Sequence, residues 1–272
     1  MPESLARRRQ CGIERSARSR RRSGATAIDG GHFVSIVSHL EKELAPTGTL
    51  RAAINISNPV LVQTDAAGTP SGVTVDLARE LAKRLGVPLE TVVIDGAGKS
   101  FEAVKAARCD IGFLAIEPAR AAEIDFTAAY VLIEGVYAVR PDAGLARNAE
   151  VDRAGVRIAV SKGAAYDLFL TRSLKYATLV RAEESFEMFV RDKLEVVAGV
   201  RQAVVRFIAA HPEMRLLDGR FMEIAQAMCL PKGRPNAARY LAAFVEEMKA
   251  SGFVAEAIAR AKQEASVAPL AN

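Results

Sequence analysis

Tryptophan is absent from the 272 residues, and cysteine and histidine occur only three times each. Cys11, Cys109 and Cys229 lie far apart, and none of them belongs to a CxxC or Cys/His cluster. The sequence therefore predicts neither a zinc site nor a disulfide framework, and we expect no resident metal or cofactor. Long apolar runs are also missing, since none approaches the roughly 18 residues that a membrane-spanning helix needs. We therefore expect no insertion into a membrane.

Excess positive charge is confined to the N-terminal end of the chain. Residues 1–33 contain eight arginines and three acidic residues, whereas the other 239 residues contain 29 basic and 29 acidic side chains. The formal net charge of +5 therefore belongs to this segment, and the neutral remainder gives no reason to expect nucleic-acid binding. Because residues 1–33 are rich in Arg and Ser and nearly lack apolar side chains, we expect a disordered basic tail.

The same tail does not have the pattern of an export signal. A secretory signal places an apolar stretch of about 7–15 residues after its basic region, but residues 23–33 are polar and rich in glycine. Three interpretations stay open: a natural basic extension of a cytoplasmic protein, sequence upstream of the true start codon, or an unusual export signal. The tail thus leaves both the periplasm and the cytoplasm open as compartments.

The rest of the chain alternates short apolar runs with amphipathic helical patterns. Residues 73–86 place their apolar side chains on one helical face and end at Gly86, as helices often do. Strands are expected at 50–56, 89–94, 109–116, 130–139, 155–161, 177–182, 194–200, 214–218 and 221–233. Helices are expected at 73–86, 100–108, 162–174, 183–192, 202–212 and 236–263, the last broken at 251–252. The expected core includes Leu114, Ile116, Phe126, Val136, Phe207, Phe244 and Met248.

Two strand–helix series, residues 50–116 and 155–218, indicate the domain organisation. Strands that alternate with helices of this length imply βαβ units and parallel sheets, and each series is too short for one large doubly wound sheet. We therefore predict an α/β protein of two small lobes joined by extended hinge segments near 135–141 and 218–226. A small-molecule site is expected in the cleft between them. The predicted lobes are residues 46–138 plus 225–272 for lobe 1, and residues 139–224 for lobe 2.

A series of short motifs, in a fixed order, resembles one protein family over roughly residues 46–262. The motifs are TGTLR (47–51), GVTVDLA (72–78), CDIG (109–112), IEPAR (116–120), IDFTAAY (124–130) and GVRIAVSKGAAYDLFL (155–170). Together they are similar to the bacterial extracellular solute-binding proteins of family 3, the amino-acid-type receptors of ABC importers.

The resemblance implies both a fold and a function. The fold would be the type II periplasmic-binding-protein fold, in which two α/β lobes on a two-strand hinge close around a ligand. The chain would bind a small carboxylate, an amino acid or a related organic acid, as the substrate-binding component of an ABC transporter. It would act as a monomer in the periplasm, with permease subunits as its partners.

Arg120 is the principal candidate for contact with this ligand. The resemblance implies that the arginine ending the Ile-x-Pro-x-Arg motif holds the ligand's carboxylate, with Ala115 beside it in the site. A planar guanidinium can donate two parallel hydrogen bonds to a carboxylate, and Pro118 restricts the loop that presents it. The alternatives are an exposed loop arginine or a salt bridge to Glu117 or Glu123.

Both lobes contribute further candidates. Gly163, Ala164 and Ala165 open a helix after the strand at 155–161, and the unpaired N–H groups of a helix N-terminus favour anions. Family members often carry hydroxyl side chains here, so only the backbone donors would remain; the alternative is an ordinary strand–helix turn. Asn58, in the loop after the first strand, would offer its amide to the ligand, although turn chemistry alone also places Asn there.

One departure from the family concerns the amine of an amino-acid ligand. The resemblance implies an Asp that pairs with the ammonium, but the nearest equivalents here are Val200 and Arg201, and an arginine would repel an ammonium. Glu134 is a substitute anion or, alternatively, a solvated strand residue. Arg201 would bind a second acidic group of the ligand, unless it is an exposed arginine at the start of a helix.

Two other functions stay open. The solute-binding fold also hosts dehydratases of the cyclohexadienyl or prephenate type, whose chemistry needs a general acid in a partly dry cleft. Glu134 and Glu117 are the candidates for that acid, but the sequence contains no evident nucleophile triad or metal-ligand set, so we expect no enzyme. The third function is a soluble ligand sensor that passes closure on to a partner protein.

Overall fold

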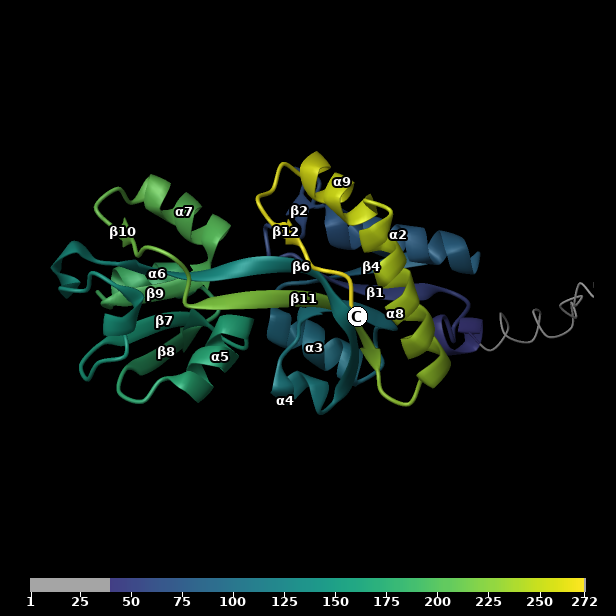
Figure 1. Ribbon diagram of the computed structural model, residues 1–272, viewed down its shortest axis with the longest axis horizontal. Helices are drawn as coiled ribbons and strands as arrows, with labels where there is room; N and C mark the ends of the chain where they lie inside the picture. The colour runs from purple at the N-terminus through teal and green to yellow at the C-terminus, as the bar shows by residue number, and fades with distance from the viewer. Residues whose placement is uncertain (1–39, 272) are drawn as a thin grey trace, which may run out of the picture.

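The computed structural model describes residues 40–271, and the predicted disordered tail and Cys11 lie outside this part. The chain forms two α/β lobes that lie side by side along the long axis of the molecule, with two long strands running between them (Figure 1). The predicted two-lobed α/β fold is confirmed. None of the helices in the described part is long and apolar enough to cross a membrane.

The first lobe consists of the predicted strand–helix series and the C-terminal helices, which return to it. Its N-terminal part contains β1 (Leu50–Asn55), β2 (Gln63–Thr64), β3 (Pro70–Ser71), α2 (Val73–Leu85), β4 (Leu89–Ile94), α3 (Ala97–Lys105), β5 (Ile111–Ala115) and α4 (Pro118–Ala121). Its C-terminal part contains α8 (Pro235–Ala250), α9 (Phe253–Arg260) and β12 (Ser266–Val267).

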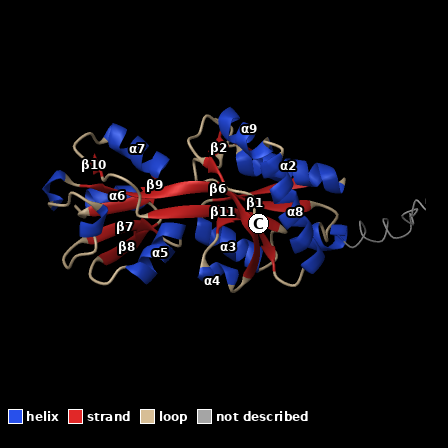
Figure 2. Ribbon diagram, viewed as in Figure 1, coloured by secondary structure: helices blue, strands red, loops and turns tan. Residues whose placement is uncertain are grey.

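The second lobe repeats the same order of elements. It contains the short 3-10 turns η1 (Pro141–Ala143) and η2 (Asn148–Glu150), followed by β7 (Arg157–Ser161), α5 (Ala165–Ser173), β8 (Thr178–Ala182), α6 (Ser185–Arg191), β9 (Val196–Val200), α7 (Arg201–Ala210) and β10 (Arg215–Leu216). Figure 2 shows its helices flanking the strands, as in the first lobe. A parallel sheet covered by helices on its faces explains why the strands read as short, continuous apolar runs.

Two long antiparallel strands, β6 (Ile124–Val139) and β11 (Met222–Pro231), connect the lobes. The sheet has the order β4-β1-β5-β11-β6-β9-β7-β8, so it is continuous from one lobe to the other. Gly135 pairs with Met222 of β11 and with Val200 of β9, which marks the point where β6 passes between its partners. A Cβ atom on Gly135 would lie 2.7 Å from Met222 Cγ, so this crossing is too close for a side chain. The exact lobe boundaries at 138/139 and 224/225 stay a prediction.

The predicted core is largely confirmed. Leu114, Val136, Phe244 and Met248 are buried, and Phe126 and Phe207 are partly buried against apolar clusters. The prediction for Ile116 is wrong: its side chain is 39% exposed, because it lies beyond the end of β5, in the turn that leads into α4. Cys109 and Cys229 are free and buried, and burial raises the pKa of both thiols.

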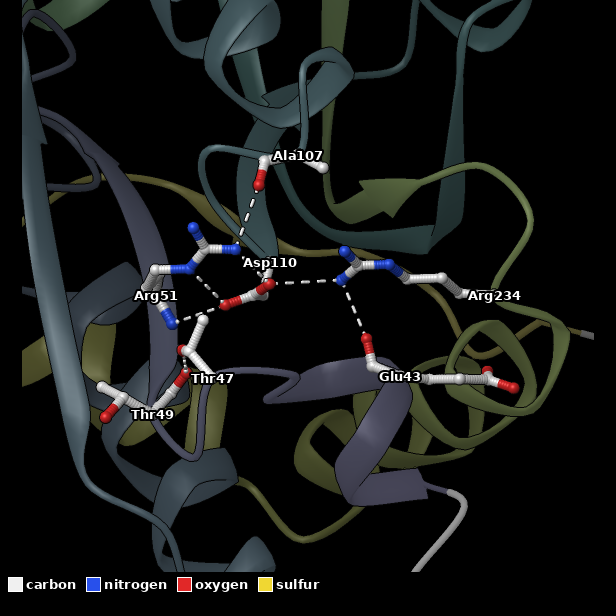
Figure 3. Close-up of polar contacts among 7 residues, drawn as sticks. All are labelled: Glu43, Thr47, Thr49, Arg51, Ala107, Asp110 and Arg234. Atoms are coloured by element: carbon white, nitrogen blue, oxygen red, sulfur yellow. Dashed lines mark hydrogen bonds and ion pairs between the residues drawn. The ribbon is translucent and has the colours of Figure 1, made fainter.

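An arginine in the first strand of each lobe holds an acid that lies just before a later strand of the same sheet, β5 in the first lobe and β9 in the second. In the first lobe, the backbone N–H, Nε and Nη2 of Arg51 donate to the fully buried Asp110 carboxylate at 3.1, 2.9 and 2.8 Å (Figure 3). Arg234, beside α8, approaches the same carboxylate at 3.3 Å and donates to the Glu43 carbonyl at 2.8 Å. This cluster ties the start of the chain's described part, the sheet and the C-terminal helices together.

In the second lobe, the backbone N–H, Nε and Nη2 of Arg157 donate to Glu195 at 2.8, 3.0 and 2.7 Å. Each arginine also donates to one carbonyl of the turn before its acid, Ala107 or Lys193, and both turn residues have a positive φ. The two lobes therefore share one local arrangement as well as one order of elements.

Candidate functional site

A cavity of about 290 Å³ lies between the lobes. The first lobe contributes the loop after β1, the start of α3, the end of β5 and the α4 turn, and the second lobe contributes the ends of β7 and β9 and the starts of α5 and α6. Residues from both lobes and from β11 line it, among them Asn58, Ala115, Arg120, Ser161, Ala165 and Gln226. The predicted small-molecule site between two lobes thus corresponds to a real cavity.

Arg120 brings a positive charge into the wall of this cavity. Its residue is 3% exposed, and burial lowers the pKa of its guanidinium, against the opposing field of Glu117. Nη1 donates to the Ala115 carbonyl at 3.1 Å, and Nη2 donates across the cleft to the Gly163 carbonyl at 2.8 Å. A guanidinium has five N–H donors, so these two bonds leave three for other acceptors.

The alternative for Arg120, a surface ion pair, does not occur within residues 40–271. Glu117 pairs instead with Arg172 of α5 at 2.5 Å, and Glu123 pairs with Lys105 at 3.4 Å. The two charged residues of the motif, Glu117 and Arg120, lie before and within the short α4 turn that begins at Pro118, and they have different partners. Arg120 is therefore a buried cation that hydrogen-bonds only to backbone carbonyls in the described part of the chain.

Asn58 lines the cavity and also closes the turn that carries it. Its Oδ1 accepts the N–H of Val60 at 3.2 Å, and its carbonyl accepts the N–H groups of Leu61 and Val62 at 3.1 and 3.0 Å. The hydrogen bonds expected of an asparagine in a turn are thus present in the structure. Its location at the cavity wall keeps the side-chain amide available to a ligand as well.

The backbone donors expected at residues 163–165 are mostly used within the protein. The N–H of Gly163 donates to Asp167 Oδ2 at 2.9 Å, and the N–H of Ala164 donates to the Ser161 carbonyl at 3.1 Å. Gly163 instead offers its carbonyl to Arg120. The expected set of three donors is therefore reduced to the N–H of Ala165, at the first turn of α5, because the Asp167 carboxylate and the Ser161 carbonyl accept the other two.

Glu134 and Arg201 are not brought together with Arg120. They pair with each other, and Arg220 adds a second contact to Glu134 at 3.2 Å. The hydrogen bond from Arg201 is the main reason that the pKa of Glu134 is lowered. Both residues line a separate surface depression of about 360 Å³ near Glu264. The cavity wall at this position is Val200, because the chain turns from β9 into α7 between these two neighbours.

Polar residues that were not predicted also line the cavity. Ser161 Oγ and Ser185 Oγ lie 2.9 Å apart, and the buried Tyr166 lines the cavity with them. Burial raises the pKa of Tyr166, and the neighbouring Ser161 and Ser185 partly offset this rise. Ser161 ends β7 and Tyr166 and Ser185 begin helices, which are the positions where ligands meet parallel sheets. Their positions at the end of a strand and at the starts of helices could have identified them from the sequence.

Several contacts cross the cleft and hold the lobes together. Besides the Arg120 bond to Gly163, Arg172 pairs with Glu117, and Lys99 of α3 pairs with Glu183 at 3.5 Å. A Cβ atom on Gly163 would lie only 3.3 Å from Gly98 Cα, so the two lobes approach closely at these glycines. The structure therefore shows the lobes closed on one another.

Comparisons with known proteins agree with this geometry. The binding component of an ABC transporter from Wolinella succinogenes, complexed with lysine, has a TM-score of 0.67 and 22% identity, over 79% of this chain and 95% of that one. A solute receptor for L-cysteine from Neisseria gonorrhoeae has a TM-score of 0.70 and 21% identity, over 83% and 92% of the two chains. An ancestral amino acid-binding protein, a precursor of cyclohexadienyl dehydratase, has a TM-score of 0.66 and 22% identity, over 80% and 97%.

At these identities the solved structures show the fold, which is that of two-lobed binding proteins. A search of curated proteins finds no match. The family model of the bacterial extracellular solute-binding proteins, family 3, matches residues 50–262, which is well over half of the chain. The resemblance stated from the motifs is confirmed: the chain belongs to the bacterial extracellular solute-binding proteins of family 3.

Proposed function

We propose that this protein binds a small organic carboxylate, an amino acid or a related acid, between its lobes and presents it to the permease subunits of an ABC importer. The observation that carries this proposal is the Arg120 guanidinium, which is buried in the cavity wall and unpaired with any carboxylate of residues 40–271. A carboxylate ligand would supply the missing charge and accept two charge-assisted hydrogen bonds. The solved relatives bound to or named for amino acids support the same ligand class.

An amine of the ligand would not form an ion pair deep in the cavity. Val200 lines the wall near the start of α7, while the carboxylates that line the cavity, Asp95, Glu183 and Glu184, are exposed at its rim. An ammonium next to the carboxylate would therefore be held by uncharged acceptors of the cavity rather than by an ion pair. The proposed ligands accordingly include acids with an amine and acids without one.

Binding rather than catalysis fits the acidic residues. A dehydratase needs a carboxyl group that holds a proton near neutral pH, but the pKa of Glu134 is lowered and its side chain lies outside the cavity. Glu117, the other candidate acid, is held by Arg172. We therefore propose no turnover, and incubation with prephenate and arogenate is expected to leave both compounds unchanged.

The first test is a thermal-shift screen of amino acids, dicarboxylates and cyclic acids, followed by calorimetric titration of the compounds that stabilise the protein. A ligand at about 100 times its Kd stabilises the folded state by about 2.7 kcal/mol. Arg120→Met is expected to weaken binding of the best carboxylate by about 30-fold or more, since a buried charge partner is lost.

Arg79→Met is the matched control, because Arg79 is an exposed arginine of α2 outside the cavity. It is expected to bind the same compound as the wild type does. Equal affinity of Arg120→Met and Arg79→Met would show that the site is elsewhere. Size-exclusion chromatography with light scattering tests the proposed monomer in the same samples.

A further inference from the structure

Gln226 is a buried polar side chain in the wall of the cavity. Its residue is 6% exposed, and it lies on β11, one of the two strands that connect the lobes. Within residues 40–271 its side-chain amide makes no hydrogen bond, although an amide can donate two and accept two. Gln226 stands out in the sequence as well, as a lone polar residue in the apolar run from 224 to 230.

The register of the sheet places Gln226 beside the Arg120 anchor. Gln226 is directly opposite Ala115 of β5, so the two side chains share one face of the sheet. The Ala115 carbonyl is one of the two acceptors that hold the guanidinium of Arg120. Arg120 and Gln226 therefore line the same cavity, one held at Ala115 and the other directly opposite it.

Among the other buried polar side chains in the described part of the protein, the hydroxyls of Ser100 and Tyr130 also lack a partner, but these two residues do not line the cavity. Lys249 donates to the carbonyls of Ala129 and Pro269 at 3.1 and 2.8 Å, and Thr127 accepts the N–H of Met228 at 3.2 Å. Burying an amide without partners costs free energy, and such groups need an explanation. An amide that faces a ligand cavity has one, because a bound molecule can complete its hydrogen bonds.

The opposite wall also offers neutral polar groups. Ser161, Ser185 and Tyr166 place three hydroxyls on the second lobe's side of the cavity, and the two serines hydrogen-bond to each other. Among the residues that line the cavity in the described part, Arg120 is the one buried charge, while Asp95, Lys162, Glu183 and Glu184 are exposed. The deep part of the cavity thus combines one cation with uncharged donors and acceptors.

We propose that Gln226 determines ligand specificity, and that the ligand carries, beyond its carboxylate, an uncharged group that both donates and accepts hydrogen bonds, a carboxamide or a hydroxyl. This inference rests on the proposed function, since Arg120 fixes one end of the ligand. A carboxamide pairs with the Gln226 amide through one donated and one accepted bond. An apolar end would leave the amide unpaired, and an anionic end would satisfy only its N–H groups.

The test uses four probes of similar shape. L-asparagine and succinamate carry a carboxamide, with and without the α-amine, and L-leucine and 4-methylpentanoate carry an isopropyl group in its place. The wild type is expected to bind each carboxamide at least about tenfold more tightly than its apolar counterpart. Gln226→Met, which keeps the length and removes both polar atoms, is expected to reduce that ratio to within about threefold.

Gln263→Met is the matched control, because Gln263 lies outside the cavity, between α9 and β12, and it is expected to keep the wild-type ratio. Gln226→Leu provides a second variant if Gln226→Met does not fold. A wild type that binds the two members of a pair equally, or binds none of the four probes, overturns the inference. The proposed function fails separately, if Arg120→Met leaves the binding of carboxylates unchanged.

Discussion

At the scale of single residues, buried charged side chains differ in whether they contact a side chain of opposite charge, and this difference identifies the site. Asp110, Glu117, Arg120, Asp167 and Lys249 are the buried charged residues in the described part of the chain. Four of them contact an opposite charge, on Arg51, Arg172, Arg181 and Glu246 respectively. Arg120 alone among these five does not, and an unbalanced buried charge is costly unless something else pairs with it. The charge that the fold leaves unbalanced is the one that faces the cavity.

The first residue-scale prediction concerns Asp110, whose two arginines lose their common partner in Asp110→Ala. We expect the free energy of unfolding to fall by about 3 kcal/mol, the lower end for a broken buried pair, because Arg51 and Arg234 are themselves partly exposed. Urea unfolding followed by circular dichroism measures it. Asp142→Ala, which removes an exposed partner of Arg140, is the control and should change stability little. Equal effects of the two variants would contradict a structural role for the cluster.

The elements were largely predictable, because their boundaries depend on local signals. β4 has the predicted bounds 89–94, and α2 ends one residue before Gly86, whose left-handed backbone caps the helix. The short elements β2, β3, α4 and β12 were not predicted, and the predicted start of β6 at 130 is six residues late. Asp125 and Thr127 interrupt the apolar pattern there, and pairing with β11 keeps the segment extended.

The site was less predictable, because it depends on which side chains meet across the cleft. Arg120 was identified from its motif, and the structure places it in the cavity wall. Glu134 and Arg201 were chosen by nearness in sequence to an expected position, but a shift of one residue at the end of β9 directs Val200 to the cavity and Arg201 to Glu134. Gln226 and the hydroxyl set come from segments far apart in the sequence.

The second prediction concerns the arginine–acid arrangement of the second lobe. Hydrogen bonds from Arg157 are the main cause of the lowered pKa of Glu195, relative to the ordinary value of 4.5. A group whose pKa is lower in the folded state contributes stability above its unfolded pKa and loses it as the pH falls through the folded pKa. Glu195→Gln is therefore expected to lower the Tm by about 2–4 °C at pH 7 and to lessen the loss of stability below about pH 4.5.

Thermal unfolding from pH 7 to pH 3 measures this prediction. Glu90→Gln, on β4, is the control, since Glu90 forms no ion pair within residues 40–271. If Glu195→Gln follows the wild-type pH profile at every pH, the ion pair contributes nothing to acid sensitivity.

At the scale of the whole molecule, the two lobes are joined by hinge strands and by contacts across the cleft. The strands β6 and β11 run between the lobes, as Figure 1 shows, and belong to one sheet that continues from one lobe to the other. The cross-cleft contacts, by contrast, exist only when the lobes touch. Two of them are ion pairs of the protein itself, Arg172–Glu117 and Lys99–Glu183. Closure is therefore stabilised by protein groups in addition to any ligand.

The last prediction tests this contribution with Arg172→Gln. The Glu117 carboxylate is 3% exposed in the closed arrangement, so without Arg172 its charge is stable only if the lobes separate and water reaches it. We expect the ligand-free variant to have a larger radius of gyration than the wild type in X-ray scattering, and to bind the best carboxylate about tenfold more weakly, because the ligand must then drive closure. A saturating concentration of that carboxylate should restore the compact radius.

Lys105→Gln removes a positive charge from a pair within the first lobe, with Glu123, and should change neither quantity. A ligand-free Arg172→Gln protein as compact as Lys105→Gln would show that the Arg172 ion pair does not hold the lobes together.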